Sequence, residues 1–165
     1  MHRCVLALGS NLGDRGQTLF LAIGSIAKIP QTSLEGVSPI VESHALTPNG
    51  FDNSQPNYLN CVVEVKTDLS PKALLQEINS IETKFGRERS EKWASRTLDI
   101  DIVTFGKQEI ETDGLIIPHP RAHERGFVLV PWMLLDENAV LPGFGSVSQL
   151  AQKYASEVWV IEDAD

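Results

Sequence analysis

Apolar residues recur with strand-like and helix-like spacings that alternate along the first two thirds of the chain. A short apolar run over residues 3–8, ending at Gly9, predicts a first strand. The next apolar positions have helical spacing, predicting a helix that Pro30 stops, and they are Leu19, Ala22, Ile23 and Ile26. Residues 34–45 are rich in β-branched residues and predict a strand that Pro39 interrupts. Residues 47–57 contain two Pro, one Gly, three Asn and one Asp, which predicts a long loop and hints at function.

A second series of elements follows this loop. Residues 58–67 predict a strand with one apolar face and with Tyr58 and Asn60 on the other face. A helix is expected to begin at Ser70-Pro71 and to end at Gly86, with a buried stripe formed by Leu74, Ile78, Ile81 and Phe85. Residues 97–104 predict another strand. A short helix near residues 147–154 and a last strand at 158–161 are also expected.

This order, β-α-β-β-α-β, predicts an α+β fold of the ferredoxin-like type, an antiparallel sheet with helices on one face. The other face then needs a cover or a ligand. Residues 107–165 show no linker, repeat or low-complexity segment, so we treat them as a C-terminal extension. We expect residues 1–165 to form a single domain, which their number suits.

Composition and charge narrow the classes of protein. Hydrophobic residues make up 42% of the chain and charged residues 22%, which are ordinary values for a soluble protein. No apolar run is long enough to cross a bilayer or to serve as a signal peptide, so we expect a cytoplasmic protein. Cys4 and Cys61 lie in strand-like runs and are interpreted as buried thiols.

The net charge of −8 argues against a nucleic-acid-binding module, which normally needs a basic surface. Five of the 14 cations nevertheless fall within 13 residues, and they are Lys84, Arg87, Arg89, Lys92 and Arg96. A local basic cluster in an acidic protein favours a small anionic ligand. A solvated basic loop is an equally good interpretation of the cluster on its own.

Two acids interrupt the apolar strand that follows the basic cluster. Side chains alternate between faces along a strand, so Asp99 and Asp101 share a face, with Cα atoms roughly 6.5 Å apart. Carboxylates this close repel unless a cation lies between them, and Mg²⁺ typically uses one or two carboxylates together with substrate phosphates. For a bare Asp-x-Asp pattern, two ordinary solvated acids remain the better interpretation.

Other candidate chemistry is weaker. The chain has neither a G-x-x-x-x-G-K-[ST] nor a G-x-G-x-x-G motif, so side chains would have to hold any nucleotide. His119 and His123 are four residues apart, but Pro118 and Pro120 prevent a regular helix, which argues against zinc. His119, Arg121 and Arg125 could bind phosphate or could belong to a structural surface loop. Trp93 and Phe127 could stack on a flat heterocycle, although aromatic residues usually pack in the core.

The segments together carry a family resemblance. K-W-A-S-R-T-L-D-I-D-I-V, residues 92–103, closely resembles the signature of 6-hydroxymethyl-7,8-dihydropterin pyrophosphokinase, an enzyme family of folate biosynthesis. Gly9-Ser10-Asn11, Thr47-Pro48, Q-P-N-Y-L-N at residues 55–60, and P-H-P-R with E-R-G-F at residues 118–127 extend the match in family order over most of the chain. The family has a ferredoxin-like fold and transfers pyrophosphate from ATP to the hydroxymethyl group of the dihydropterin, releasing AMP.

The resemblance also implies roles for single residues. Asp99 and Asp101 would hold two Mg²⁺ ions that bridge the triphosphate. The pterin would be bound by Thr47, Pro48, Tyr58, Asn60 and Phe127, with the ring between Tyr58 and Phe127. ATP would be bound by Glu82, Arg89, Trp93, Arg96, Ile102, His119 and Arg125. Arg89 and Arg96 would be catalytic because they offset negative charge in the transition state.

The chain departs from some family members at four positions, Asn79, Gly114, Ile116 and Pro120. Two other function classes stay open, a Mg²⁺-dependent phosphohydrolase that uses the same acids and a ferredoxin-like binding module without catalysis. We expect a monomer whose partners are its small-molecule substrates. The polar segments 47–57 and 86–95 are expected to be mobile without ligands and to close over bound substrates.

Overall fold

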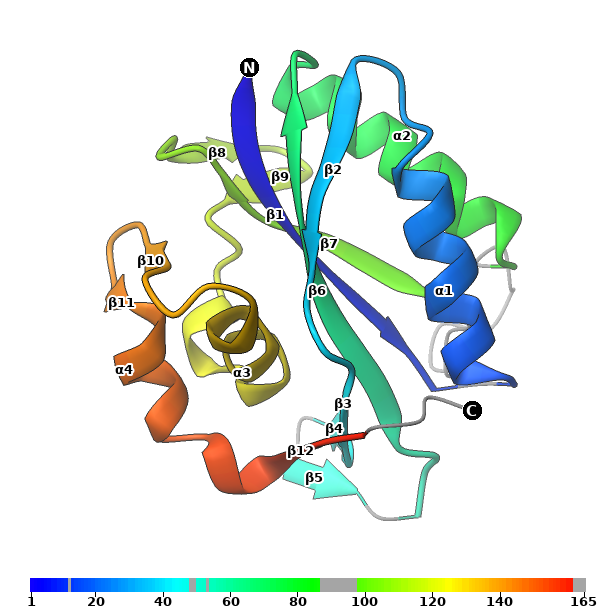
Figure 1. The fold of residues 1–165 in the computed structure, drawn as a ribbon, viewed down its shortest axis with the longest axis vertical. Coiled ribbons are helices and arrows are strands. Elements are labelled where there is room, and N and C mark those ends of the chain that lie inside the picture. The colour runs from blue at the N-terminus through cyan, green and yellow to red at the C-terminus, as the bar shows by residue number, and fades with distance from the viewer. Residues whose placement is uncertain (12, 48–49, 53, 87–97, 162–165) are drawn as a thin grey trace.

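The computed structural model describes residues 1–11, 13–47, 50–52, 54–86 and 98–161 (Figure 1). Four of the predicted site residues therefore lie outside the described residues, and they are Pro48, Arg89, Trp93 and Arg96. Most of the segment 86–95, which we expected to be mobile, lies outside them as well.

An antiparallel sheet forms the centre of the molecule, and its longest strands are the two that the apolar runs predict most clearly. Its strands are β1 (His2–Ser10), β2 (Thr32–Val37), β3 (Val41–Ser43), β6 (Tyr58–Thr67), β7 (Asp99–Phe105) and β12 (Val158–Val160). They pair in the order β12-β3-β6-β1-β7, and β2 also pairs with β6. β1 and β6 are therefore central, whereas β7 is hydrogen-bonded to β1 alone among the strands of the described chain.

Two helices cover one face of this sheet (Figure 1). They are α1 (Arg15–Ile26) and α2 (Pro71–Lys84). Asp14 caps α1, and Ser70 caps α2 with Pro71 in its first turn, as the start signal at residues 70–71 predicts. Apolar side chains of both helices pack on alternate residues of the strands, including Leu98, Ile100 and Ile102 of the acidic strand segment. This packing leaves Asp99 and Asp101 on the opposite face.

The C-terminal third covers part of that opposite face. α3 (Gly126–Leu135) packs against β6 and β3, and α4 (Val147–Gln152) packs against α3. They bury a second apolar core with the other faces of the strands, including Val62 and Val103. The two helices of the predicted core therefore share one face, and the extension supplies the cover that the second face was expected to need (Figure 1). α3 covers only part of it, and a pocket lies beside the helix.

Several boundaries differ from those predicted. The predicted strand 34–45 is divided into β2, β3 and the start of β4 (Ala45–Thr47), with a break around Pro39. The predicted loop 47–57 contains half of a short hairpin, because β4 pairs with β5 (Gly50–Asp52). Two further hairpins join β8 (Ile110–Thr112) to β9 (Leu115–Ile117) and β10 (Val140–Leu141) to β11 (Gly145–Ser146).

The remaining elements of the extension are short. Two 3₁₀ turns, Ala122–Glu124 and Ala155–Glu157, precede α3 and β12. The predicted last helix and last strand are confirmed as α4 and β12, although both end earlier than expected. Within the described ranges, no helix has the length and apolar character needed to span a membrane.

Candidate active site

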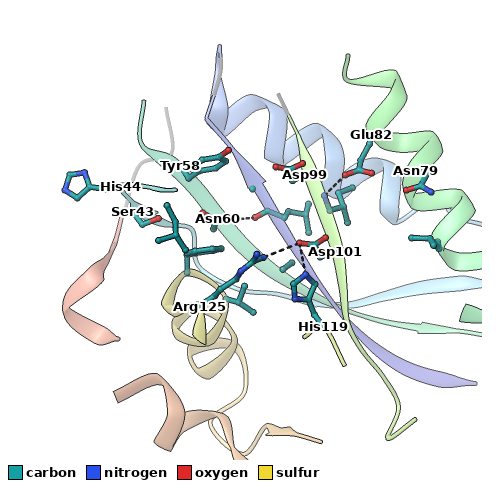
Figure 2. A pocket seen from close by; sticks show the side chains of 18 of the residues that line it. Ser43, His44, Tyr58, Asn60, Asn79, Glu82, Asp99, Asp101, His119 and Arg125 are labelled. Atoms are coloured by element: carbon teal, nitrogen blue, oxygen red, sulfur yellow. Dashed lines mark hydrogen bonds and ion pairs between the residues drawn. The ribbon is translucent and has the colours of Figure 1, made fainter. Parts of the chain in front are cut away.

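A pocket of about 580 Å³ lies on the sheet face that α3 leaves open (Figure 2). Its floor is formed by β1, with β6 on one side and β7 on the other. Side chains from α2, from the segment before α3 and from β3 complete its walls. Of the predicted site residues, the pocket brings together Tyr58, Asn60, Glu82, Asp99, Asp101, His119, Arg125 and Phe127.

Strand register explains why these residues meet. Gly9 on β1 is paired with Asn60 on β6 and with Asp99 on β7. Ala7, two residues earlier, is paired with Val62 and Asp101 in the same way. Directly paired residues lie on the same face of a sheet, so Asn60 and Asp99 face the pocket from strands separated by β1, roughly 10 Å apart. Between them, on β1, lie Gly9 and Ala7, the two smallest residue types.

On the β6 side the polar groups are neutral and buried. Asn60 is 7% exposed, and its Nδ2 donates a hydrogen bond of 3.3 Å to the carbonyl oxygen of Leu8. Its Oδ1 is buried and has no hydrogen-bond partner among the described residues. Ser43 on β3 is paired with Tyr58 and is 1% exposed, and its buried hydroxyl likewise has no partner in the described part of the chain. Because buried polar groups normally find partners, these atoms are suited to a ligand with hydrogen-bonding edges.

A polar network supports the outer end of this side. His44 Nδ1 lies 3.0 Å from Asn57 Oδ1, and Arg15 donates to the Asn57 carbonyl at 2.8 Å. Arg15 also donates to Glu42 at 2.9 Å, and the indole of Trp159 donates to the same carboxylate at 3.1 Å. Partial burial would raise the pKa of Glu42, but these donors outweigh it and hold that pKa below its usual value. The network ties α1, β3 and β12 to the strand that carries the pocket residues.

On the β7 side the groups are charged and partly exposed. Oδ2 of Asp101 lies 3.8 Å from His119 Nε2 and 3.8 Å from Arg125 Nη1, and its side chain is 46% exposed. Both contacts are drawn in Figure 2, where Asp99 points into the same space. The backbone N–H of His119 donates to the Val103 carbonyl, which holds the imidazole beside β7.

The protonation of His119 follows from its surroundings. Burial lowers the pKa of His119 below its usual value, and the attraction of Asp101 opposes this only in part. The backbone N–H of Arg121 donates to Nδ1 of the ring at 3.2 Å. In the neutral ring the proton is therefore on Nε2, which faces Asp101. His119 can donate a hydrogen bond from this position to an anionic oxygen.

Glu82 has a different position from the other acids. It is 2% exposed, and its Oε2 accepts a hydrogen bond of 2.9 Å from the backbone N–H of Ile100 (Figure 2). Ile100 lies between the two aspartates on β7. The carboxylate of Glu82 therefore holds β7 to α2 at Ile100, the residue between Asp99 and Asp101.

The aromatic walls come from separate elements. Tyr58 begins β6, and Phe127 lies in the first turn of α3, next to Arg125. The guanidinium carbon of Arg125 lies 5.6 Å from the centre of the Phe127 ring. Both rings line the pocket, which suits a flat heterocycle between them. Thr47 does not line it, and its hydroxyl donates to the Gly50 carbonyl in the β4–β5 hairpin.

A second pocket of about 290 Å³ adjoins the first at Asp101 and His119. Its remaining walls are largely apolar and include Ile102, Leu115, Ile116 and Pro120. Three positions at which the chain departs from family members, Gly114, Ile116 and Pro120, line this pocket, whereas the fourth, Asn79, lines the first.

Some residues that line the first pocket had not been expected in the site from the sequence, among them Ala7, Gly9, Ser43 and His44. A glycine at the end of an apolar strand is a recognised sign of close approach by another group, so Gly9 could have been found. Ser43 and His44 had no such signal, because their place depends on the pairing of β3 with β6.

Comparison with known proteins gives a consistent result. Residues 5–137 match the family model described as 7,8-dihydro-6-hydroxymethylpterin-pyrophosphokinase. The chain is 37% identical over 155 residues to the 2-amino-4-hydroxy-6-hydroxymethyldihydropteridine pyrophosphokinase of Haemophilus influenzae, covering 94% of each chain. It is 43% identical over 126 residues to the Bacillus subtilis enzyme of the same name, covering 76% of this chain and 73% of that one.

Solved structures agree on the fold. A bifunctional HPPK-DHPS of Plasmodium falciparum, crystallised with pteroate, superposes on 94% of this chain with a TM-score of 0.70 and 16% identity. The chain spans 42% of that protein, so the likeness concerns one part of it. At this identity the superposition supports the architecture, whereas the family rests on the sequence matches. On those matches, the chain belongs to the 7,8-dihydro-6-hydroxymethylpterin-pyrophosphokinase family.

Proposed function

We propose that this protein transfers the pyrophosphoryl group of ATP to 6-hydroxymethyl-7,8-dihydropterin and releases AMP, a step of folate biosynthesis. The observation that carries the proposal is the register across β6, β1 and β7. It sets the neutral acceptor of Asn60 and the acidic pair Asp99 and Asp101 on one face of one pocket. A neutral heterocycle and a charged triphosphate need such contrasting groups within reach of each other.

The pterin is assigned to the β6 side. Oδ1 of Asn60 is available to accept a hydrogen bond from an N–H group on the edge of the ring. Tyr58 and Phe127 offer their ring faces on either side of the space. Thr47, the last residue of β4, and Pro48 are retained as pterin-binding residues, although Thr47 does not line the pocket and Pro48 lies outside the described residues.

The acids on β7 fit a magnesium site that a substrate completes. Among the described residues no group of three or more His, Cys, Asp or Glu side chains could hold a metal by itself. Two carboxylates on one strand face, with phosphate oxygens and water as further ligands, match the coordination that Mg²⁺ prefers. We assign two Mg²⁺ ions to Asp99 and Asp101. Bound there, they would neutralise phosphate charge and help to orient the triphosphate.

ATP is assigned to the β7 side and to the adjoining apolar pocket. Arg125 and the Nε2–H of His119 can bind phosphate oxygens, which would replace their present contacts with Asp101. Ile102 offers an apolar wall to the base in the second pocket. Glu82 is retained as an ATP-binding residue, and it acts on the site by holding β7. Arg89, Trp93 and Arg96 complete the assignment from outside the described residues, with Arg89 and Arg96 in the catalytic role.

The reaction is a displacement at the β-phosphorus of ATP. The hydroxymethyl oxygen forms a bond to that phosphorus, the bond from it to the oxygen bridging the α- and β-phosphorus breaks, and AMP leaves with that oxygen. The hydroxyl proton is released. The chain contributes by holding the two substrates in line across β1 and by placing Arg125 and His119 near the developing charge.

The fold type, the oligomeric state and the location of the protein are also proposed. The strand order β7-β1-β6-β2 supports a ferredoxin-like core, to which α3, α4 and β12 are added within one domain of residues 1–165. We propose a monomer, since eight of the predicted site residues already form one pocket within a single chain. We expect it in the cytoplasm, where two unpaired buried thiols such as Cys4 and Cys61 stay reduced, and with no nucleic-acid partner at a net charge of −8.

One assay tests the proposed function against both alternatives. AMP release from Mg²⁺-ATP is measured with and without 6-hydroxymethyl-7,8-dihydropterin. We expect AMP in stoichiometric amounts with a pterin diphosphate, and only in the presence of the pterin. ADP or phosphate without pterin would indicate a phosphohydrolase. No turnover of ATP under any condition would indicate a binding module, and either result would overturn the proposal.

A further inference from the structure

The amide of Asn60 lies close to the backbone of β1 at Gly9. Its Nδ2 reaches past Gly9 to the carbonyl of Leu8, at 3.3 Å. A methyl group built on Gly9 would come within 2.6 Å of this Nδ2, whereas its next contacts, 3.5 Å to Asn60 Cγ and 3.6 Å to Tyr58 Cδ1, are ordinary. An alanine at position 9 would therefore force Nδ2 of Asn60 to move from its present place.

The backbone of Gly9 does not require glycine. Gly9 does not have a positive φ angle, and within β1 it pairs regularly with Asn60 on β6 and with Asp99 on β7. An alanine would fit this strand conformation, as Ala7 does on the same face. The reason for glycine at position 9 is consequently the space above it and not the path of the chain.

The orientation of the amide decides what it can bind. With Nδ2 directed to Leu8, Oδ1 is the atom left buried without a partner. Asn60 then presents an acceptor, which selects a ligand edge that carries N–H groups. An amide displaced from Gly9 would lose its bond to Leu8 and could rotate to present its donor instead. The space over Gly9 thus decides whether Asn60 presents a hydrogen-bond acceptor or a donor to the pocket.

We propose that Gly9 is a positioning residue that acts through Asn60: by lacking a side chain it holds the Asn60 amide in the orientation that accepts a hydrogen bond from the heterocyclic substrate. The proposal rests on the proposed function for the identity of this substrate. It assigns no contact between Gly9 and the ligand.

A double-mutant cycle tests it with four proteins: wild type, Gly9→Ala, Asn60→Ala and the double variant. Calorimetry measures 6-hydroxymethyl-7,8-dihydropterin binding in the presence of Mg²⁺ and a non-hydrolysable ATP analogue. Gly9→Ala is expected to weaken pterin binding about tenfold or more in the wild-type background, since a buried hydrogen bond is lost. It is expected to have no further effect in the Asn60→Ala background, because the displaced atom is absent.

A ligand-free measurement accompanies the cycle. The side-chain amide resonances of Asn60, identified by their loss in Asn60→Ala, are recorded in wild type and Gly9→Ala without substrates. They should shift in Gly9→Ala. Gly24→Ala is the matched control and should leave both binding and these resonances unchanged. Gly24 lies on α1, and apart from the adjoining backbone no atom of the described residues comes within 4 Å of an added methyl group. Thermal unfolding is measured for all variants.

The outcomes separate the possibilities. An equal loss of pterin binding in the two backgrounds would show that the methyl group blocks the ligand directly, which would overturn the positioning role. Unchanged Asn60 resonances in Gly9→Ala would overturn it as well. If Gly9→Ala alone unfolds and the double variant folds, the close contact between the two residues is confirmed. If the wild type does not bind the pterin, the proposed function fails, while the resonances still decide the role of Gly9.

Discussion

The two sides of the pocket prepare for a ligand in opposite ways. On β6 and β3, Asn60 and Ser43 are neutral, buried and left with unpartnered oxygens. On β7, Asp101 is half exposed and already has a histidine and an arginine within 3.8 Å. A neutral ring can be recognised by groups that are fixed in advance, whereas charged groups need counter-ions whenever the ligand is absent.

This difference predicts how substitutions on each side of the pocket affect substrate binding, turnover and stability. Removing a fixed neutral group should weaken one substrate and leave the other unchanged. Removing a charged group should affect the reaction more than the fold, because its partners exchange when phosphate and metal arrive. Substitutions at four positions test this contrast.

The largest effect is expected on the charged side. Asp101→Ala should reduce turnover about a hundredfold or more, because several kcal/mol of charge stabilisation depend on the acidic pair. Thermal stability should hardly change, because the loss of a long, partly exposed contact with Arg125 is offset by relief of the repulsion from Asp99. Steady-state kinetics over a Mg²⁺ titration measures the loss. Asp113→Asn, an exposed acid between β8 and β9, is the control, and near-normal turnover by Asp101→Ala would remove the metal assignment.

An intermediate effect is expected on the neutral side. Asn60→Ala should weaken pterin binding by about 1–3 kcal/mol, the cost of leaving a buried ligand group unpaired. Binding of the ATP analogue should be unchanged. Calorimetry with each ligand separates the two. A loss confined to the nucleotide would show that the sides of the pocket have been assigned in reverse.

Glu82 tests whether the charged side depends on its strand. Glu82→Ala should lower the free energy of unfolding by about 1–2 kcal/mol, because the N–H of Ile100 loses its acceptor. Glu82→Gln keeps an acceptor oxygen and should recover most of that loss. Chemical denaturation gives the stability, and a Mg²⁺ titration of turnover gives the apparent metal affinity. Equal stability of the two variants would contradict the anchoring role.

The smallest effect is expected from the network at the outer end of the neutral side. The pKa of Glu42 is lowered, so its contribution to stability is present above its ordinary value of 4.5 and is lost as pH falls through the lower folded value. The loss should be a fraction of 1 kcal/mol, since the pair with Arg15 is partly exposed. Unfolding between pH 6 and 3.5 measures it. Glu42→Gln should abolish that part of the pH dependence, and an identical profile in wild type and variant would exclude the network as its cause.

Apolar periodicity and helix-capping residues predicted the elements in which they occur. Elements whose structure depends on packing against distant parts of the chain were not predicted. β6 was predicted with its observed bounds, and the start of α2 followed from Ser70-Pro71. α3 was not predicted, because it is apolar on all sides and contains Pro131, which hides the helical period. The second core that α3 builds could not be inferred without it, so the second face was expected to need a cover or a ligand, but the helix that covers it was not identified.

The site residues likewise fall into those that the sequence could identify and those that it could not. Alternation along a strand placed Asp99 and Asp101 together, and the resemblance identified Asn60, Tyr58 and Phe127 as candidates. Gly9 was visible as the glycine that ends the first strand, but its pairing with Asn60, like the pairing of Ser43 with Tyr58, depends on which residues face each other across strands distant in sequence. That register is fixed by the packed sheet and is absent from any single segment.

The most direct test of the account is a crystal structure of the protein with Mg²⁺, a non-hydrolysable ATP analogue and 6-hydroxymethyl-7,8-dihydropterin. We predict an N–H edge of the pterin within about 3 Å of Asn60 Oδ1, metal ions held by Asp99 and Asp101, and the hydroxymethyl group over β1 between them. A pterin bound beyond β7, or a triphosphate lying over Asn60, would contradict the division of the pocket into a neutral and a charged side.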